Sequence, residues 1–291
     1  MPKFTYFVFV SCLAGSEINL YALDVAIGGL AHSQTVPLSG KVLPLAVTPD
    51  RRRLYASAIG RKDGKEENHI DAFELEPLSG RLLPISSTVI AARMAYITVD
   101  RKGSWLLGAS FRSSLIAVYS ISGRGQIRPV GCFSMAMANR AHQILLDHSN
   151  RYAFVPNLGA DLVVQLLFDE RNGMLRENSP SSVNMQNGAG CRHIAFHPNC
   201  RFVYPLNELD GSIVVFGLDA SNGTLVDVGK DSILRPDITG NPWCAQIHVS
   251  RDETRLFASE RRGRTLACWN IEPASGQLSN RTLIETGRNP R

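Results

Sequence analysis

Side chains that could bind anions or transfer protons are spread along the chain, most of them in its second half. They include His142, Arg192, His193, Glu208 and Arg261. A guanidinium group binds carboxylates and phosphates through charge-assisted hydrogen bonds, and an imidazole or a carboxylate can move a proton to or from water. If the fold brings these side chains together, their combined chemistry suits a small anionic ligand.

Signature motifs of several other enzyme classes are absent from the sequence. The chain has no Walker loop, no GxSxG elbow and no HExxH motif, which argues against kinases, serine hydrolases of the GxSxG fold and zincins. The six cysteines form no CxxC pair and lie far apart, at Cys12, Cys132, Cys191, Cys200, Cys244 and Cys268. We therefore expect buried free thiols of a reducing compartment, without a disulfide framework, a metal site or a cofactor.

The composition is that of a soluble globular protein. Of the 291 residues, 44% are hydrophobic and 20% are charged. No apolar run reaches the roughly 18 to 20 residues that a membrane-spanning helix needs. The 31 basic and 26 acidic residues give a net charge of +5, and the excess is spread along the chain. This pattern favours an anionic small molecule as partner, and neither a nucleic acid nor a membrane.

A repeat of about 50 residues organises the chain. One half of the repeat is a polar turn followed by a short aromatic-rich strand, and the other half is an apolar strand, a turn with a glycine and a further strand. The apolar strands are expected at 18–23, 70–75, 115–121, 162–168, 213–218 and 266–271. The turn glycines are Gly29, Gly80, Gly125, Gly173, Gly223 and Gly276, spaced 51, 45, 48, 50 and 53 residues apart. A period near 50 with about four short strands per unit is typical of a β-propeller blade, which predicts an all-β propeller with one domain over residues 1–291.

The innermost strand of each blade, which lines the central channel, is expected at 42–47, 94–99, 142–146, 193–196 and 245–249. The N-terminal segment up to about residue 36 supplies three strands of a further blade. Residues 3–14 also resemble a short signal peptide, but a similar segment recurs downstream, so we prefer a strand and a cytoplasmic protein. The chain stops where a sixth innermost strand would begin. This predicts a ring shortened at the C-terminus by about one blade, with open strand edges that could self-associate.

Strand direction alternates within a blade, so two sets of positions open on the same face. They are the start of each innermost strand and the loop between the second and third strands. The first set holds Arg93, His142, Arg192, His193, Trp243 and Arg291, and the second holds Arg112, Asn157, Asp161, Asn207, Glu208 and Arg261. We therefore expect the ligand site at this end of the channel.

Two segments resemble a known family. Residues 188–198 (GAGCRHIAFHP) and 203–209 (VYPLNEL) are similar to the GxGPRHxxFHP…Y…NEL signature of the lactonase-type propellers. That family includes bacterial propeller-type 6-phosphogluconolactonases and fungal carboxymuconate-cyclizing enzymes. Residues 141–142, 156–161, 243–252 and 289–291 also match its repeats. The resemblance covers the whole chain and implies a seven-bladed propeller of which about one blade is missing.

The resemblance also implies a catalytic set of His142, Arg192, Glu208 and Arg291, with Arg261 as a weaker addition. Because they open on the same face of the propeller, the substrate-binding candidates are His193, Asn207, Arg261, Asp161 and Arg112. The implied chemistry is the opening or closing of a lactone without a metal. Glu208 or His142 would move a proton, while Arg192 and Arg291 would bind the substrate anion and stabilise an oxyanion.

The chain departs from the family pattern at four internal positions. Cys191 replaces the proline of the GPRH motif, and Asn157 stands where many members have aspartate. Phe111 and Arg112 stand where phosphogluconolactonases often have tyrosine and asparagine, which leaves the substrate open.

Structural roles are the alternative for several of these side chains. His193, His197 and His248 alternate with apolar residues, as hydrogen-bonding histidines between blades would. Arg112 and Arg261 could be solvated loop charges. The sequence thus predicts a hydrolase of an anionic sugar lactone, with 6-phosphogluconolactone of the pentose phosphate pathway as first candidate. A carboxy-cis,cis-muconate cycloisomerase and a non-catalytic propeller scaffold are the two alternatives.

Overall fold

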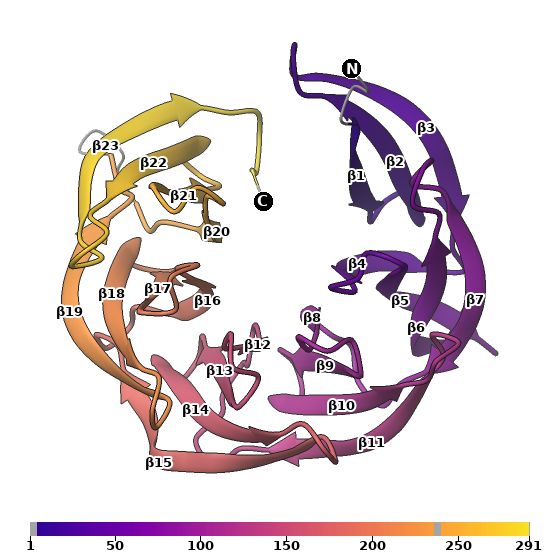
Figure 1. The fold of residues 1–291 in the computed structure, drawn as a ribbon, viewed down its shortest axis with the longest axis horizontal. Helices are drawn as coiled ribbons and strands as arrows, with labels where there is room; N and C mark the ends of the chain where they lie inside the picture. Colours follow the sequence, from indigo (N-terminus) through magenta and orange to yellow (C-terminus); the bar gives the residue numbers. More distant parts are fainter. Residues whose placement is uncertain (1–4, 236–239, 291) are drawn as a thin grey trace. The chain divides into compact units, whose positions relative to one another are not determined.

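The structure is a computed structural model that describes residues 5–235 and 240–290. Within these ranges all regular elements are β-strands, and they form six antiparallel sheets in which neighbours along the chain are neighbours in space. None of the described residues lies in a helix that is long and apolar enough to cross a membrane. The chain is a β-propeller, as the repeat predicted, and each sheet is one blade (Figure 1).

The first compact unit extends to Cys132 and holds three blades. The first blade has the strands β1 (Thr5–Cys12), β2 (Glu17–Asp24) and β3 (Gly29–Pro37). The second has β4 (Lys41–Val47), β5 (Arg53–Lys62), β6 (Lys65–Leu75) and β7 (Leu82–Val89). The third has β8 (Tyr96–Val99), β9 (Trp105–Ser110), β10 (Leu115–Ile121) and β11 (Ile127–Ser134), which ends just past the unit boundary.

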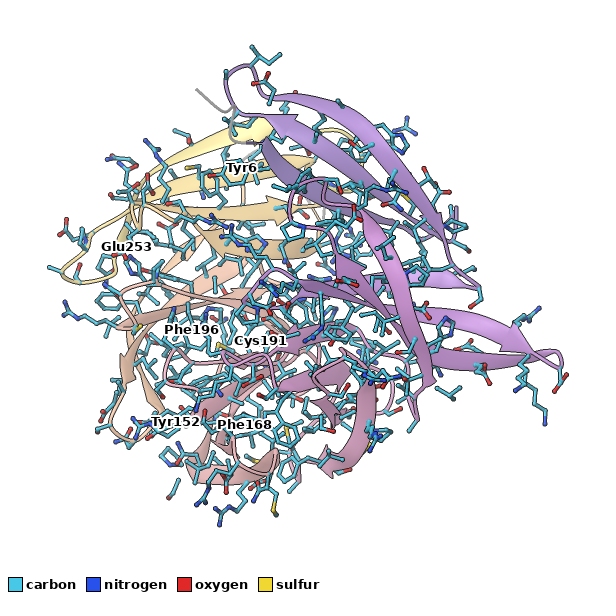
Figure 2. All side chains as sticks on the ribbon, turned by 45° about the vertical axis from the view of Figure 1, so that its right-hand side comes forward. Tyr6, Tyr152, Phe168, Cys191, Phe196 and Glu253 are labelled. Carbon is cyan, nitrogen blue, oxygen red and sulfur yellow. The ribbon has the colours of Figure 1, made fainter. Side chains whose placement is uncertain are left out.

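The second compact unit begins at Phe133 and holds the other three blades. Its first blade has β12 (Leu145–Leu146), β13 (Tyr152–Asn157), β14 (Leu162–Asp169) and β15 (Met174–Asn184). The next has β16 (Cys191–Phe196, labelled at both ends in Figure 2), β17 (Phe202–Asn207), β18 (Ser212–Asp219) and β19 (Thr224–Ser232). The last has β20 (Cys244–Val249), β21 (Arg255–Glu260), β22 (Thr265–Ile271) and β23 (Leu278–Glu285).

The middle strands of a blade are buried on both faces. Every residue of β13 and β17 is buried, whereas the outermost strands β11 and β23 are mostly exposed. Apolar residues of adjacent blades share one core, in which Tyr204 of β17 packs in the same cluster as Trp269 of β22. This double burial explains why the apolar strands lack a strict alternation of apolar and polar residues.

The two halves of the sequence repeat contact each other between adjacent blades. The hydroxyl of Tyr152 on β13 donates to the carbonyl of Ser221 at 2.7 Å, in the glycine turn of the next blade. Tyr204, the third residue of β17, donates to the carbonyl of Gly276 in the glycine turn of the following blade at 3.0 Å. Gly223 has φ +71, and a Cβ there would collide with the Tyr152 ring. The aromatic ring of one blade therefore packs directly against the turn glycine of the next blade, where only glycine leaves room for the ring.

Several details differ from the sequence expectations. In the first repeat the glycine with positive φ is Gly28, while Gly29 already belongs to β3. The innermost strand expected at 142–146 is regular only over Leu145–Leu146. All six cysteines are free, but Cys132 is exposed and not buried, because it lies on the outermost strand β11. The described residues form six blades, five of four strands and one of three, against seven in the family type.

Candidate functional site

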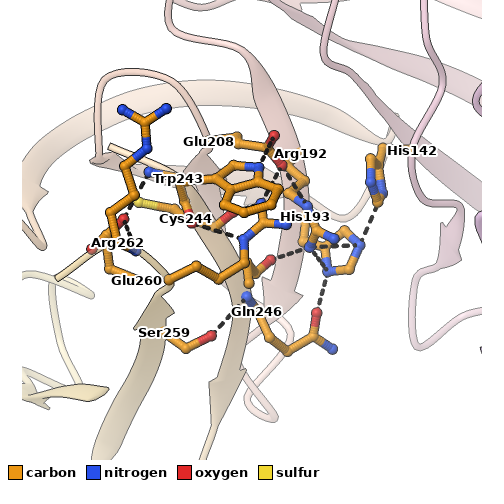
Figure 3. A network of polar contacts seen from close by, with 12 residues as sticks. His142, Arg192, His193, Glu208, Trp243, Cys244, Gln246, Ser259, Glu260 and Arg262 are labelled. Carbon is orange, nitrogen blue, oxygen red and sulfur yellow. Dashed lines mark hydrogen bonds and ion pairs between the residues drawn. The ribbon is translucent and has the colours of Figure 1, made fainter. Parts of the chain in front are cut away.

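Four chain positions of the second unit meet because neighbouring strands are antiparallel. Cys191, which starts β16, pairs with Asn207, which ends β17, and Cys244, which starts β20, pairs with Glu260, which ends β21. The residues next to these pairs are therefore brought together at one end of the two blades. They are Arg192, Glu208, Trp243 and Arg261, and Figure 3 shows the polar network of this region.

The carboxylate of Glu208 is held by three donors. Its Oε2 atom lies 2.7 Å from Nε of Arg192 and 2.9 Å from Nη2 of Arg261. Its Oε1 atom accepts a hydrogen bond from Nε1 of Trp243 at 3.1 Å. An ionised carboxylate offers about four acceptor positions, so three of them are occupied. Glu208 thus orients two guanidinium groups and has about one acceptor position left for a further donor.

Arg261 is anchored from several sides, and its side chain is only 3% exposed. The guanidinium carbon lies 3.9 Å from the centre of the Trp243 ring, in a cation–π contact. Nε donates to the carbonyl of Trp243 at 2.9 Å and Nη2 to the carbonyl of Cys244 at 2.7 Å. Arg261 is therefore a buried part of the cluster and not a solvated loop charge.

Two histidines continue the network beyond Arg192. Nη1 of Arg192 lies 3.3 Å from both ring nitrogens of His193, and it donates to the carbonyl of Ala245 on β20. Nε2 of His193 lies 3.1 Å from Nδ1 of His142, and the two rings meet edge to face with centres 4.9 Å apart. His142 lies before β12 and its backbone nitrogen donates to the carbonyl of Pro156 at 3.0 Å.

The environment of His193 keeps its imidazole neutral. Burial, followed by the charge of Arg192 and by His142, holds the pKa of His193 well below its usual value of 6.5. His142 is only partly buried. Of the two, His142 is the more exposed imidazole, and His193 is its neutral hydrogen-bond partner.

The loop before β16 is held by Asp161. Its carboxylate oxygens accept the backbone N–H groups of Gly188 and Gly190, each at 2.7 Å. Gly190 has φ +70, and a Cβ there would lie 2.6 Å from Cγ of Leu209. Asp161 thus fixes the backbone that leads into Arg192.

The other predicted site residues have different positions. Asn207 is buried in β17, and its Nδ2 donates to Oγ of Ser212 at 2.8 Å. Arg112 lies between β9 and β10 of the first unit. Arg291 lies outside the described residues. Among the described residues no three His, Cys, Asp or Glu side chains are grouped so that they could hold a metal ion.

Sequence reasoning gave no role to Gln246 or to Glu260. Oε1 of Gln246 contacts Nδ1 of His193, and Oε1 of Glu260 accepts the backbone N–H of Trp243 at 2.7 Å. For Gln246 a signal was present, since it stands two residues before His248 and so shares its face of β20. Burial raises the pKa of the nearby thiols of Cys191 and Cys244, which keeps both protonated.

His197 and His248 fit the structural alternative differently. His197 is fully buried, and its Nε2 contacts the carbonyl of Glu253 in the next blade at 3.0 Å, while its Nδ1 accepts the backbone N–H of Asn199 at 3.1 Å. It is therefore a hydrogen-bonding histidine between blades. His248 is exposed and contacts Gln246.

Comparisons with known proteins match the chain along nearly its full length. It is 28% identical over 285 residues to a 6-phosphogluconolactonase of Serratia proteamaculans (strain 568), and 25% identical over 284 residues to one of Enterobacter sp. (strain 638). Each match covers 98% of this chain and 83% of the relative.

Solved structures agree with this likeness. The periplasmic gluconolactonase PpgL of Pseudomonas aeruginosa superimposes with a TM-score of 0.84 at 26% identity, over 99% of this chain and 85% of that one. A putative 6-phosphogluconolactonase of Bacteroides fragilis superimposes with a TM-score of 0.87 at 18% identity, over 100% of this chain and 84% of that one. At this identity the similarity concerns the fold alone. The family model for the seven-bladed β-propeller lactonases matches residues 7–291, and the chain belongs to that family.

Proposed function

We propose that this protein hydrolyses an anionic sugar lactone, and that 6-phosphogluconolactone is its substrate. Membership of the lactonase family and the two relatives named 6-phosphogluconolactonase support the reaction class. The observation that carries the proposal is the connected set of His142, His193, Arg192 and Glu208 within one compact unit. It combines an imidazole for proton transfer with a fixed guanidinium for anion stabilisation.

The proposed reaction uses His142 as the base. Its imidazole removes a proton from a water molecule, whose oxygen forms a bond to the lactone carbonyl carbon. The negative charge that develops on the carbonyl oxygen is stabilised by Arg192. The bond between the carbonyl carbon and the ring oxygen then breaks, and His142 returns its proton to the ring oxygen. One water is consumed, and one hydroxy acid is released.

Glu208 has a positioning role in this proposal. Its three donors leave little acceptor capacity for a proton from water, whereas its ion pair holds Arg192 at 2.7 Å. Arg261 and Trp243 fix Glu208 in turn, at 2.9 and 3.1 Å. Such an arrangement keeps the Arg192 guanidinium in place before the substrate arrives, and preorganised donors are the main source of oxyanion stabilisation.

The test is the hydrolysis rate of 6-phosphogluconolactone by the purified protein, after subtraction of the spontaneous rate. We expect a clear excess, and we expect His142→Asn to lower it about 10²- to 10⁴-fold, the usual contribution of a general base. A folded wild-type protein that leaves the lactone at its spontaneous rate would refute the proposal. In a parallel cuvette, loss of the ultraviolet absorbance of carboxy-cis,cis-muconate without lactone hydrolysis would identify the cycloisomerase instead. Activity in neither assay would favour a scaffold.

A further inference from the structure

We propose that Gln246 is a positioning residue that sets the tautomer of His142 through His193. The inference rests on the proposed function and deepens it, because it says how the base of the reaction is prepared. Gln246 is the third residue of β20, whereas His193 lies on β16 of the preceding blade. The side chain therefore reaches across the boundary between two blades.

Four side chains form a continuous line of polar contacts, and Figure 3 shows three of them, His142, His193 and Gln246. Nδ1 of His142 lies 3.1 Å from Nε2 of His193, and Nδ1 of His193 contacts Oε1 of Gln246. At the far end, Nε2 of Gln246 lies 3.0 Å from Nε2 of His248. In this line only the amide of Gln246 has fixed donor and acceptor atoms, since each imidazole nitrogen can be either.

The amide fixes the direction of each hydrogen bond in turn. A carbonyl oxygen can only accept, so Nδ1 of His193 carries the proton and donates to Gln246. His193 is neutral, because burial and Arg192 hold its pKa well below its usual value, and so its Nε2 has a lone pair. Nε2 of His193 therefore accepts from His142, whose proton must be on Nδ1.

The consequence is a defined lone pair on His142. A neutral imidazole with its proton on Nδ1 presents Nε2 as the basic atom, which is what the removal of a proton from water requires. With the opposite tautomer the ring would present an N–H at that atom and could not act as the base. Selection of the correct tautomer by a partner on the other ring nitrogen is a known determinant of histidine function.

The backbone around Gln246 is well held. Its backbone nitrogen donates to Oγ of Ser259 at 3.2 Å, and the carbonyl of its neighbour Ala245 accepts from Arg192. The groups that face His193 are His142, the cation Arg192, Gln246 and the exposed His248. An amide does not titrate, so the direction of the line is retained at any pH at which His193 stays neutral.

The direct test is nitrogen NMR of the full-length protein labelled with 15N-histidine. In the wild type we expect His142 to show a pyrrole-type Nδ1 and a pyridine-type Nε2. In Gln246→Leu we expect averaged shifts, because both tautomers then become populated. His248→Phe, a change at an exposed residue, removes the acceptor of the amide N–H and should also give a partial shift toward averaging.

Measurements of kcat and KM distinguish a positioning role of Gln246 from a role in folding. Gln246→Leu should lower kcat on the order of 10- to 100-fold, with little change in KM. This is the range found when the hydrogen-bond partner that orients a metal-ligating histidine is removed. Gln165→Leu is the matched control. Gln165 also joins two blades, since its Nε2 donates to the carbonyl of Pro180 at 2.8 Å and its Oε1 accepts the N–H of Leu225 at 2.7 Å. We expect its loss to leave the kcat and the His142 spectrum unchanged.

Two results would overturn the inference. One is a wild-type His142 with its proton on Nε2, and the other is a folded Gln246→Leu protein with the wild-type His142 spectrum. The spectrum does not depend on turnover of any lactone. A protein that fails to hydrolyse 6-phosphogluconolactone but has the expected, Gln246-dependent tautomer would therefore refute the proposed function alone.

Discussion

Replacement of Glu208 by glutamine removes the anion that forms ion pairs with two buried arginines. The variant keeps the size of the side chain, but Arg192 and Arg261, which are 8% and 3% exposed, would then face a neutral amide. Breaking a buried ion pair by removing one partner costs about 3–5 kcal/mol, because a buried charge is left without compensation. We expect Glu208→Gln to lower the free energy of unfolding by that amount.

The measurement is urea and thermal unfolding followed by circular dichroism. For a cooperative unit of roughly 150–250 residues, 1 kcal/mol corresponds to about 2–4 °C in Tm, so the expected decrease is about 6–20 °C. The matched control is Glu285→Gln, which removes an ion pair of 3.3 Å to Arg235, but with the glutamate 84% exposed. Exposed pairs contribute at most about 1 kcal/mol, so this control should unfold almost as the wild type does.

A double variant tests the physical cause. Glu208→Gln combined with Arg261→Met removes one of the two cations together with the anion, so we expect it to be less destabilised than the sum of the two single variants. If Glu208→Gln were no less stable than Glu285→Gln, the charge of Glu208 would not be stabilising the buried arginines, and its assignment as the positioning carboxylate of the cluster would be wrong.

Three further predictions concern the loop before β16 and the pH dependence of stability. Asp161→Asn weakens the hydrogen bonds to Gly188 and Gly190, and urea titration should give a loss of about 1.5–3 kcal/mol, as for hydrogen bonds to a charged group. Gly190→Ala places a Cβ 2.6 Å from Leu209 in a backbone of φ +70, and we expect a loss of at least about 1 kcal/mol in the same assay. The pKa of His193 is lowered in the folded state, so below pH 6.5 the unfolded chain binds the additional proton. Above pH 6.5 the titration of His193 should therefore not lower the stability of the folded protein. As the pH falls from 6.5 toward the pKa of His193 in the folded state, the free energy of unfolding should decrease by up to about 1.4 kcal/mol per pH unit, a slope that His193→Phe should abolish.

The fold was predictable because each blade carries the same local signals. The apolar strand expected at 115–121 has the bounds of β10, and the turn glycines from Gly80 onward have positive φ. The aromatic residues that start β13 and β17, Tyr152 and Phe202, lie against the turn glycines of the next blades, Gly223 and Gly276, so ring and glycine recur together with the period. The segment 142–146 was predicted less well, because most of it lacks the strand pairing seen elsewhere and His142 is held by the carbonyl of Pro156.

The candidate site was predictable only at the level of the backbone. Alternating strand direction predicted that Arg192, Glu208 and Arg261 come to one end of the blades, and these three form ion pairs there. Which side chains they contact depends on rotamers, which no spacing specifies. The contact of Glu208 with three donors and the stacking of Arg261 on Trp243 therefore became apparent only in the structure.

The most direct test of the central claim is the rate of 6-phosphogluconolactone hydrolysis by the 291-residue protein beside His142→Asn, with Glu208→Gln assayed below its own unfolding transition. We expect the wild type to exceed the spontaneous rate and His142→Asn to lose about 10²- to 10⁴-fold of that excess. We expect Glu208→Gln to keep the wild-type pH dependence at a lower rate, since Glu208 carries no proton in the reaction. A spontaneous rate from folded wild-type protein, or an undiminished rate from His142→Asn, would contradict the account.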